Sequence, residues 1–182
     1  FAISAFGLKV YYPSYKAFAF LFNEIFLART YPIVRELDTY LDCGANIGLS
    51  VLWYKLFNPN LKVTAYEPDP KSFFYLRKNL RTNKIRGVKI VEAALSSKEG
   101  RRRFYVIQDP IQNLDSALTL NQDLPYKELT VKTMKLSRFV RTPVSLLKMD
   151  IEGGEYEVVE DLVKSDKMRF VEKMILETHY FD

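Results

Sequence analysis

The 182-residue chain contains a single cysteine, Cys43, and a single histidine, His179. One cysteine cannot form an intrachain disulfide, and one cysteine with one histidine cannot supply the four ligands of a structural zinc site. These absences exclude disulfide-stapled and zinc-ribbon folds. Because scarce cysteine is typical of reducing compartments, we expect a cytoplasmic protein.

Long apolar runs are also missing. The richest early stretch, residues 15–22, is interrupted by Asn23 and Glu24 and falls short of the about 20 residues that a membrane-spanning helix needs. No small-residue cleavage site follows it, so the sequence predicts neither a membrane span nor a signal peptide. Its aromatic residues are attributed to core packing in preference to a helix lying on a membrane surface.

Repeats, low-complexity tracts and flexible linkers are absent too, with only 7 glycines and 8 prolines in the chain. The remaining composition, 48% hydrophobic and 14% aromatic, is that of a globular domain able to build its own core. A net charge of +5 is compatible with an acidic partner but does not require one.

Short apolar segments alternate with helical patterns along most of the chain. We expect strands at residues 39–43, 61–66, 88–92, 144–149 and 170–177, and helices at 15–30, 46–57, 68–80 and 154–164. Residues 101–143 break the alternation, with strands at 103–107 and 129–133 flanking a long polar loop. The pattern predicts an α/β fold with a doubly wound, mostly parallel sheet: one domain at 39–182, preceded by a helical segment, 1–38, packed on its core.

A glycine turn follows the first strand of the expected domain, with the sequence Asp42-Cys43-Gly44-Ala45-Asn46-Ile47-Gly48. Its glycine spacing differs from the dinucleotide fingerprint, and no Lys-Ser/Thr pair follows as in a phosphate-binding loop. The turn is either a plain strand-to-helix connection or a place where backbone amides approach a ligand. A dehydrogenase is therefore disfavoured.

Glu67 ends the next strand, 19 residues after Gly48. An acidic residue at about this distance from a glycine turn can accept hydrogen bonds from ribose hydroxyls. Glu67 alone could simply cap the following helix. Together with the glycine turn, however, it favours a ligand that contains a nucleoside.

Two further strand ends carry acidic residues and the histidine. Asp150 and Glu152 follow the strand at 144–149, and Glu177 and His179 share one face if the last strand extends that far. Such a group suits general-base catalysis. Asp150, Glu177 and His179 would also suit a divalent ion such as Mg²⁺. Glu152 fits equally well as an acid in a first helical turn.

Five segments stand in an order that resembles the FkbM family of S-adenosylmethionine-dependent methyltransferases: LDCGANIG at 41–48, YEPDP at 66–70, ALS at 94–96, LKMDIEGGE at 147–155 and LETH at 176–179. The resemblance covers roughly residues 35–180, and DIEGGE at 150–155 is its most specific part. It implies a Rossmann-like class I methyltransferase fold with S-adenosylmethionine as cofactor.

The resemblance implies a role for each matching position. The glycine turn would hold the methionine end of the cofactor, Glu67 the ribose and Pro68 the adenine, with Asp150 near the transferred methyl group. The residues expected to contact the cofactor are Asp42, Gly44, Ala45, Asn46, Gly48, Glu67, Pro68, Glu92, Ala93 and Asp150. The catalytic candidates are Asp150, Glu152, Glu177 and His179. The acceptor's proton would go to His179 or Asp150, or a metal ion would acidify the acceptor hydroxyl.

The chain departs from class I enzymes in one respect, because no further helix and antiparallel strand pair follow Glu177 within these residues. The last strand would then be an open edge, so we expect a homodimer. The expected function is O-methylation of a small molecule or glycan. RNA methylation is a weaker alternative, based on eleven basic and two acidic residues at 71–103. A catalytically inactive, cofactor-binding partner subunit is a third.

Overall fold

The computed structural model describes residues 1–34, 36–107, 116–117 and 126–178. The elements in chain order are β1 (Ala2–Ala5), β2 (Leu8–Tyr11), α1 (Tyr15–Phe22), the π-helical turn η1 (Asn23–Leu27), β3 (Thr39–Cys43), α2 (Leu49–Phe57), β4 (Lys62–Tyr66), α3 (Pro70–Thr82), β5 (Val88–Val91), β6 (Ala94–Leu95), β7 (Gly100–Ile107), β8 (Ser116–Ala117), β9 (Tyr126–Met134), the 3₁₀ turn η2 (Leu136–Arg138), β10 (Leu146–Met149), α4 (Glu155–Lys164), the 3₁₀ turn η3 (Met168–Phe170) and β11 (Met174–Leu176).

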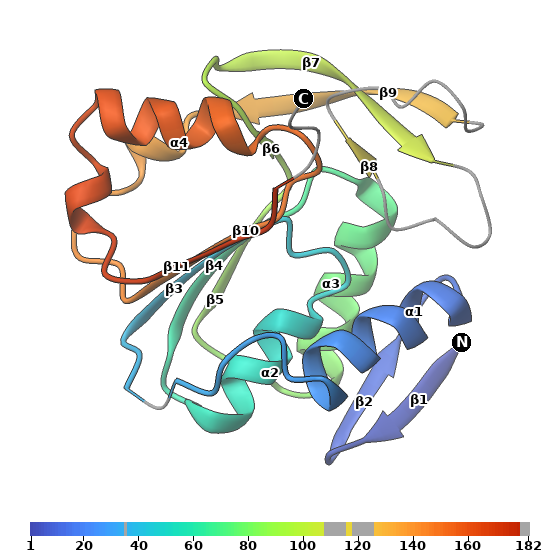
Figure 1. The fold of residues 1–182 in the computed structure, drawn as a ribbon. Coiled ribbons are helices and arrows are strands. Elements are labelled where there is room, and N and C mark those ends of the chain that lie inside the picture. The colour runs from blue at the N-terminus through green and yellow to red at the C-terminus, as the bar shows by residue number, and fades with distance from the viewer. Residues whose placement is uncertain (35, 108–115, 118–125, 179–182) are drawn as a thin grey trace.

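A parallel sheet of five strands, in the order β11-β10-β3-β4-β5, forms the centre of the molecule. Helices α2 and α3 cover one face of this sheet and α4 covers the other, as Figure 1 shows. Successive residues of β10 alternate between the two cores: Leu146 packs with α2 and α3, and Leu147 packs with α4. Parallel sheets are normally covered by helices on both faces, as this one is. The predicted α/β fold with a mostly parallel sheet is therefore confirmed.

A second sheet, in the order β6-β9-β7-β8, forms from the region where the alternation breaks. Strands β7 and β9 pair antiparallel from Gly100–Thr133 to Ile107–Tyr126, which extends both strands beyond their predicted bounds. Phe104 and Val131 form a small separate core with Ala94. Within the predicted loop, residues 116–117 are described as β8, and residues 126–128 belong to β9.

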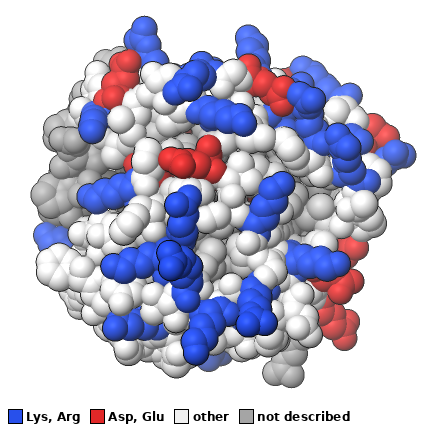
Figure 2. Space-filling view, turned by 180° about the vertical axis from the view of Figure 1, so that it is seen from behind, with Lys and Arg blue, Asp and Glu red and all other residues white. Residues whose placement is uncertain are grey.

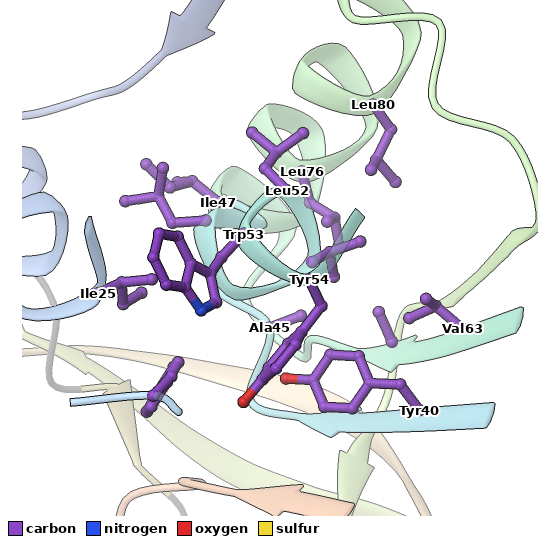
Figure 3. Close-up of a cluster of buried hydrophobic side chains, with 14 of the residues drawn as sticks. Ile25, Tyr40, Ala45, Ile47, Leu52, Trp53, Tyr54, Val63, Leu76 and Leu80 are labelled. Carbon is purple, nitrogen blue, oxygen red and sulfur yellow. The ribbon is translucent and has the colours of Figure 1, made fainter. Parts of the chain in front are cut away.

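The N-terminal residues form a β-hairpin and a short helix that pack on α2 and α3. The hairpin of β1 and β2 was not predicted, and the helix expected at 15–30 ends at Phe22, followed by the π-helical turn η1. Phe26 of η1 contacts Trp53 of α2 edge to face, with ring centroids 5.2 Å apart. Figure 3 shows Ile25 beside the same Trp53 ring, within the large hydrophobic cluster over the sheet.

Two predicted boundaries are wrong for local reasons. The strand expected at 170–177 is only Met174–Leu176, because the 3₁₀ turn η3 occupies Met168–Phe170. The helix expected from residue 46 begins at Leu49, because Asn46 and Gly48 adopt left-handed backbone angles that no helix contains. No helix among the described residues is long and apolar enough to cross a membrane.

Candidate functional site

A cavity of about 480 Å³ opens at the carboxyl ends of β3, β4 and β10. Ligands of doubly wound sheets bind at this edge, so its position matches the sequence-based expectation. Residues of α1 and η1 form one wall, and Leu95 and Phe104 of the second sheet form another. The lining comprises Phe20, Leu21, Glu24, Ile25, Tyr31, Gly44, Ala45, Asn46, Leu49, Ser50, Tyr66, Glu67, Pro68, Ser72, Ala93, Ala94, Leu95, Phe104, Lys148, Asp150, Ile151, Glu152, Glu177 and Thr178.

The glycine turn forms the floor of the cavity and approaches the end of β10 closely. A Cβ atom on Gly44 would lie 1.7 Å from the carbonyl oxygen of Asp150, and the φ of Gly44 is +82°. Only glycine is compatible with both conditions. The amides of Gly44 and Ala45 donate to the carbonyl of Tyr66, at 3.1 and 2.9 Å, which fixes the turn against β4.

Glu67 connects the glycine turn to the loop before α3. The amide of Asn46 donates to its Oε2 at 2.7 Å, and the amide of Asp69 donates to its Oε1 at 2.8 Å. Burial raises the pKa of Glu67 to about 8, although these two hydrogen bonds oppose the shift. The structure therefore brings the turn and Glu67 together in one cavity, as their spacing predicted.

Lys148 is a buried cation between two carboxylates beneath the cavity. Its ammonium donates to the carbonyl of Gly44 at 2.7 Å and lies 2.9 Å from Asp150 and 3.8 Å from Asp42. Burial disfavours its charged form, but the charges of Asp150 and Asp42 outweigh burial and hold the pKa of Lys148 well above its ordinary value. Ser50 donates to the other carboxylate oxygen of Asp42.

Asp42 remains incompletely satisfied in this arrangement. Its Oδ1 is buried and has no hydrogen-bond partner among the described residues. Burial raises the pKa of Asp42, which Lys148 and the Ser50 hydrogen bond oppose. The sequence motifs predicted a role for Asp42 but none for Lys148. The sequence feature that could have indicated its role is a lysine in the otherwise apolar strand β10. The parallel register of β10 with β3 places Lys148 opposite Asp42.

The acidic residues after β10 and β11 do meet at the cavity. Asp150, Glu152 and Glu177 all line it. The strand β11 ends at Leu176, before Glu177. His179 lies outside the described residues, so the expected proximity of these two side chains stays a prediction. Glu155, in contrast, accepts from the amides of residues 151 and 153 at 2.9 Å each and organises the start of α4.

The other predicted positions divide into lining and supporting residues. Ala45, Asn46, Pro68 and Ala93 line the cavity, whereas Gly48 lies outside the lining, at the start of α2. Glu92 is exposed and does not line the cavity, unlike its neighbour Ala93.

Metal binding has no support in the described part of the chain. No group of three or more His, Cys, Asp or Glu side chains is arranged there to hold a metal ion. The suggested set of Asp150, Glu177 and His179 includes one residue outside that part.

The charge of the lining is strongly asymmetric. Five carboxyl groups line the cavity, and Lys148 is the one basic side chain among the described lining residues. The carboxyl groups belong to Glu24, Glu67, Asp150, Glu152 and Glu177. A cavity with this excess of acids suits a ligand that carries positive charge and hydroxyl donors.

Comparison with known proteins gives consistent results. The chain is 28% identical over 197 residues to the 31-O-demethyl-FK506 methyltransferase FkbM of Streptomyces tacrolimicus, covering 90% of this chain and 75% of that protein. It is 27% identical over 169 residues to Methyltransferase 1 of Beauveria bassiana, covering 79% and 66% respectively.

The crystal structure of methyltransferase FkbM from Methylobacillus flagellatus has the same fold, with a TM-score of 0.53 at 17% identity. That alignment covers 79% of this chain but spans only about a third, 34%, of the other. The model of the methyltransferase FkbM domain matches residues 42–182, which include the glycine turn, Glu67 and the acidic segment after β10. The chain therefore belongs to the FkbM family of methyltransferases.

Proposed function

We propose that the chain binds S-adenosylmethionine and transfers its methyl group to a hydroxyl oxygen of a small molecule or glycan. The observation that carries the proposal is the acid-rich cavity over the glycine turn, with Glu67 fixed at its edge. S-adenosylmethionine combines a positive sulfonium with ribose hydroxyls, and this lining complements both features. The named substrate of the Streptomyces relative, 31-O-demethyl-FK506, supports an oxygen acceptor.

The residues present fit the parts of this cofactor. Each oxygen of Glu67 accepts one backbone amide and keeps a lone pair that can accept from a ribose hydroxyl. Pro68 and Ala93 supply small apolar surface for the adenine. The start of α2, which has no side-chain cap and whose Leu49 and Ser50 line the cavity, would present backbone amides to the methionine carboxylate.

Asp150 is placed to accept the proton that the acceptor loses. It lines the cavity, and its carboxylate lies 2.9 Å from the Lys148 ammonium. The bound cofactor supplies an activated methyl group, and the acceptor oxygen forms the new C–O bond as the C–S electron pair returns to sulfur. Displacement of this kind depends mainly on alignment, which the hydrogen bonds between the ends of β3 and β10 support.

Calorimetric titration tests the proposal. We expect S-adenosylmethionine and S-adenosylhomocysteine to bind with micromolar affinity and NAD not to bind. Glu67→Ala should weaken cofactor binding by about 1–3 kcal/mol, because it leaves the ribose hydroxyls without their hydrogen-bond acceptor in a buried site. Binding of NAD alone, or of neither cofactor, would contradict the proposal. Cofactor binding without transfer to any hydroxyl acceptor would favour a non-catalytic partner subunit.

RNA methylation is a second candidate, favoured by the distribution of basic residues. Figure 2 shows a broad face on which Lys and Arg side chains greatly outnumber acidic ones. Residues 71–91 hold seven basic and no acidic residues, and none of the seven forms an ion pair within the described part of the chain. This segment begins beside the cavity, because Ser72 lines it.

Fluorescence anisotropy with a labelled RNA oligonucleotide distinguishes the two candidates. If RNA is the acceptor, binding should be tight at low salt and weaken steeply as salt rises, because phosphate contacts release counterions. A double variant, Arg77→Gln with Arg81→Gln, should then bind RNA more weakly with unchanged cofactor affinity. An absence of RNA binding at low salt would leave the small-molecule acceptor.

A further inference from the structure

The N-terminal segment contributes a carboxylate to the cavity that the sequence analysis did not anticipate. Glu24 lies on the π-helical turn η1 and lines the cavity opposite the strand ends of the central sheet. The turn is held by hydrogen bonds from the amide of Ala28 to the carbonyl of Asn23, at 2.7 Å, and from that of Thr30 to the carbonyl of Glu24, at 3.1 Å. π-helical turns are rare and occur frequently at functional sites.

Packing holds η1 in this position. Ile25 and Phe26, which follow Glu24, are each 3% exposed and belong to the large hydrophobic cluster. Phe26 contacts Trp53, and its ring stacks on Phe22 with centroids 4.7 Å apart. Glu24 is thus presented to the cavity by a well-packed turn.

Glu24 shares its surroundings with Asp150 and Lys148. Burial raises the pKa of Glu24, the negative charge of Asp150 raises it further, and the positive charge of Lys148 opposes both. Burial raises the pKa of Tyr31, which also lines the cavity, and the charges of Lys148, Asp150, Asp42 and Glu24 act on this pKa as well. These groups therefore form one electrostatic unit near the carboxyl ends of β3 and β10.

Lys148 cannot neutralise this unit by itself. It already lies within 4 Å of both Asp42 and Asp150, and Glu24 adds a third carboxyl group that faces the cavity. A ligand with a positive charge would relieve the excess negative charge, whereas a neutral ligand of the same shape would not.

We propose that Glu24 is a specificity-determining residue that makes the cavity bind the positively charged methyl donor more tightly than the neutral product of transfer. This inference rests on the proposed function. The two molecules differ in one methyl group and in the charge of the sulfur, because transfer leaves the C–S electron pair on sulfur. Their ammonium and carboxylate groups are the same in both. Discrimination by Glu24 would therefore weaken binding of the spent cofactor after each turnover.

Calorimetric titration of wild type and Glu24→Gln tests the inference with three ligands. These are S-adenosylmethionine, S-adenosylhomocysteine and an analogue with a protonated amine in place of the methylsulfonium group. We expect wild type to bind the two charged ligands at least about tenfold more tightly than the neutral one, which corresponds to about 1.4 kcal/mol. Glu24→Gln should remove most of this preference and change binding of the neutral ligand less than about twofold.

Glu36→Gln is the matched control. It makes the same change of net charge in the N-terminal segment, at an exposed residue that is not among those lining the cavity. It should leave all three affinities unchanged, and Glu24→Asp should keep most of the preference. Circular dichroism confirms that each variant is folded.

Three outcomes would overturn the inference. Equal losses for all three ligands in Glu24→Gln would show that Glu24 contacts a part that they share, such as the ammonium group. Equal affinity of wild type for the charged and neutral ligands would overturn it even if the variant fails to fold. If Glu36→Gln reduced the preference as much as Glu24→Gln does, the preference would depend on the net charge of the protein and not on the position of Glu24. Failure of wild type to bind any of the three would instead contradict the proposed function.

Discussion

Lys148 illustrates how buried charges depend on one another at the scale of single residues. Both Lys148 and Asp42 carry charge and lie in central strands of the sheet. The Lys148 side chain is only 4% exposed, and that of Asp42 is fully buried. Taking such charges out of water is costly, and only mutual attraction and hydrogen bonds compensate for it. The same pairing fixes Gly44, through its carbonyl, against the end of β10.

Replacing Lys148 with methionine should therefore be severely destabilising. The change leaves Asp42 and Asp150 without their cation, and removing one partner of a buried pair typically costs about 3–5 kcal/mol. Urea denaturation measures the loss. Adding Asp150→Asn should cost less than the sum of the two single changes, whereas additivity within about 0.5 kcal/mol would show that the residues do not interact.

Glu67 should make the stability of the fold depend on pH. Its pKa is raised from 4.5 to about 8 in the folded protein, so between these values the native state holds a proton that the unfolded state releases. The free energy of unfolding then falls as pH rises from about 5 to 8.

Urea denaturation of wild type and Glu67→Gln at pH 5, 6.5 and 8 checks this. From pH 5 to pH 8 the free energy of unfolding of wild type should fall by about 2–4 kcal/mol more than that of the variant, because one pKa unit corresponds to about 1.4 kcal/mol. The variant loses a hydrogen bond at every pH, so the slope is the informative quantity. Parallel curves would show that Glu67 does not titrate as argued.

At the scale of elements, Asn79 joins three segments that are distant in sequence. Its amide donates to the carbonyls of Tyr11 in β2, at 3.0 Å, and of Ile47 in the glycine turn, at 2.9 Å. The amide of Tyr11 donates back to Asn79 at 2.7 Å. Helix α3 thus positions both the N-terminal hairpin and the floor of the cavity.

Asn79→Ala should destabilise the protein by about 3 kcal/mol, because it leaves buried backbone groups without partners. Asn83→Ala is the matched control one turn later, since Asn83 makes equivalent bonds with Lys9 at the surface, where water can replace them. That variant should lose no more than about 1 kcal/mol. Thermal denaturation compares the two, and equal losses would contradict the role assigned to burial.

At the scale of the whole molecule, the N-terminal segment shares one hydrophobic cluster with the helices over the sheet. Phe18 and Phe26 lie in the same cluster as Trp53 and Leu76. Such continuity predicts that the segment and the central sheet unfold together.

Trp53, the single tryptophan, reports on this interface. Its fluorescence and the far-ultraviolet circular dichroism should give the same midpoint in urea. Phe26→Ala should lower both midpoints together, with a loss of about 3–5 kcal/mol. Separate midpoints for the two signals would show that the N-terminal segment unfolds independently.

Local pattern was sufficient to predict the α/β fold, the glycine turn and its pairing with Glu67. Apolar periodicity sets each strand and helix, and parallel strands bring their carboxyl ends to one edge, so residues after neighbouring strands meet wherever that sheet forms. The bounds of β11 and α2 were less accurate, because 3₁₀ turns and left-handed residues interrupt the pattern.

The N-terminal hairpin, the Lys148 pairs and the entry of Glu24 into the cavity were decided by tertiary structure. Lys148 becomes a buried cation only when β10 pairs with β3 in a register that sets it opposite Asp42. Glu24 lines the cavity from a turn whose Phe26 packs on Trp53, 27 residues away along the chain. Such contacts join residues that are distant in sequence, and no local spacing encodes which of them will meet.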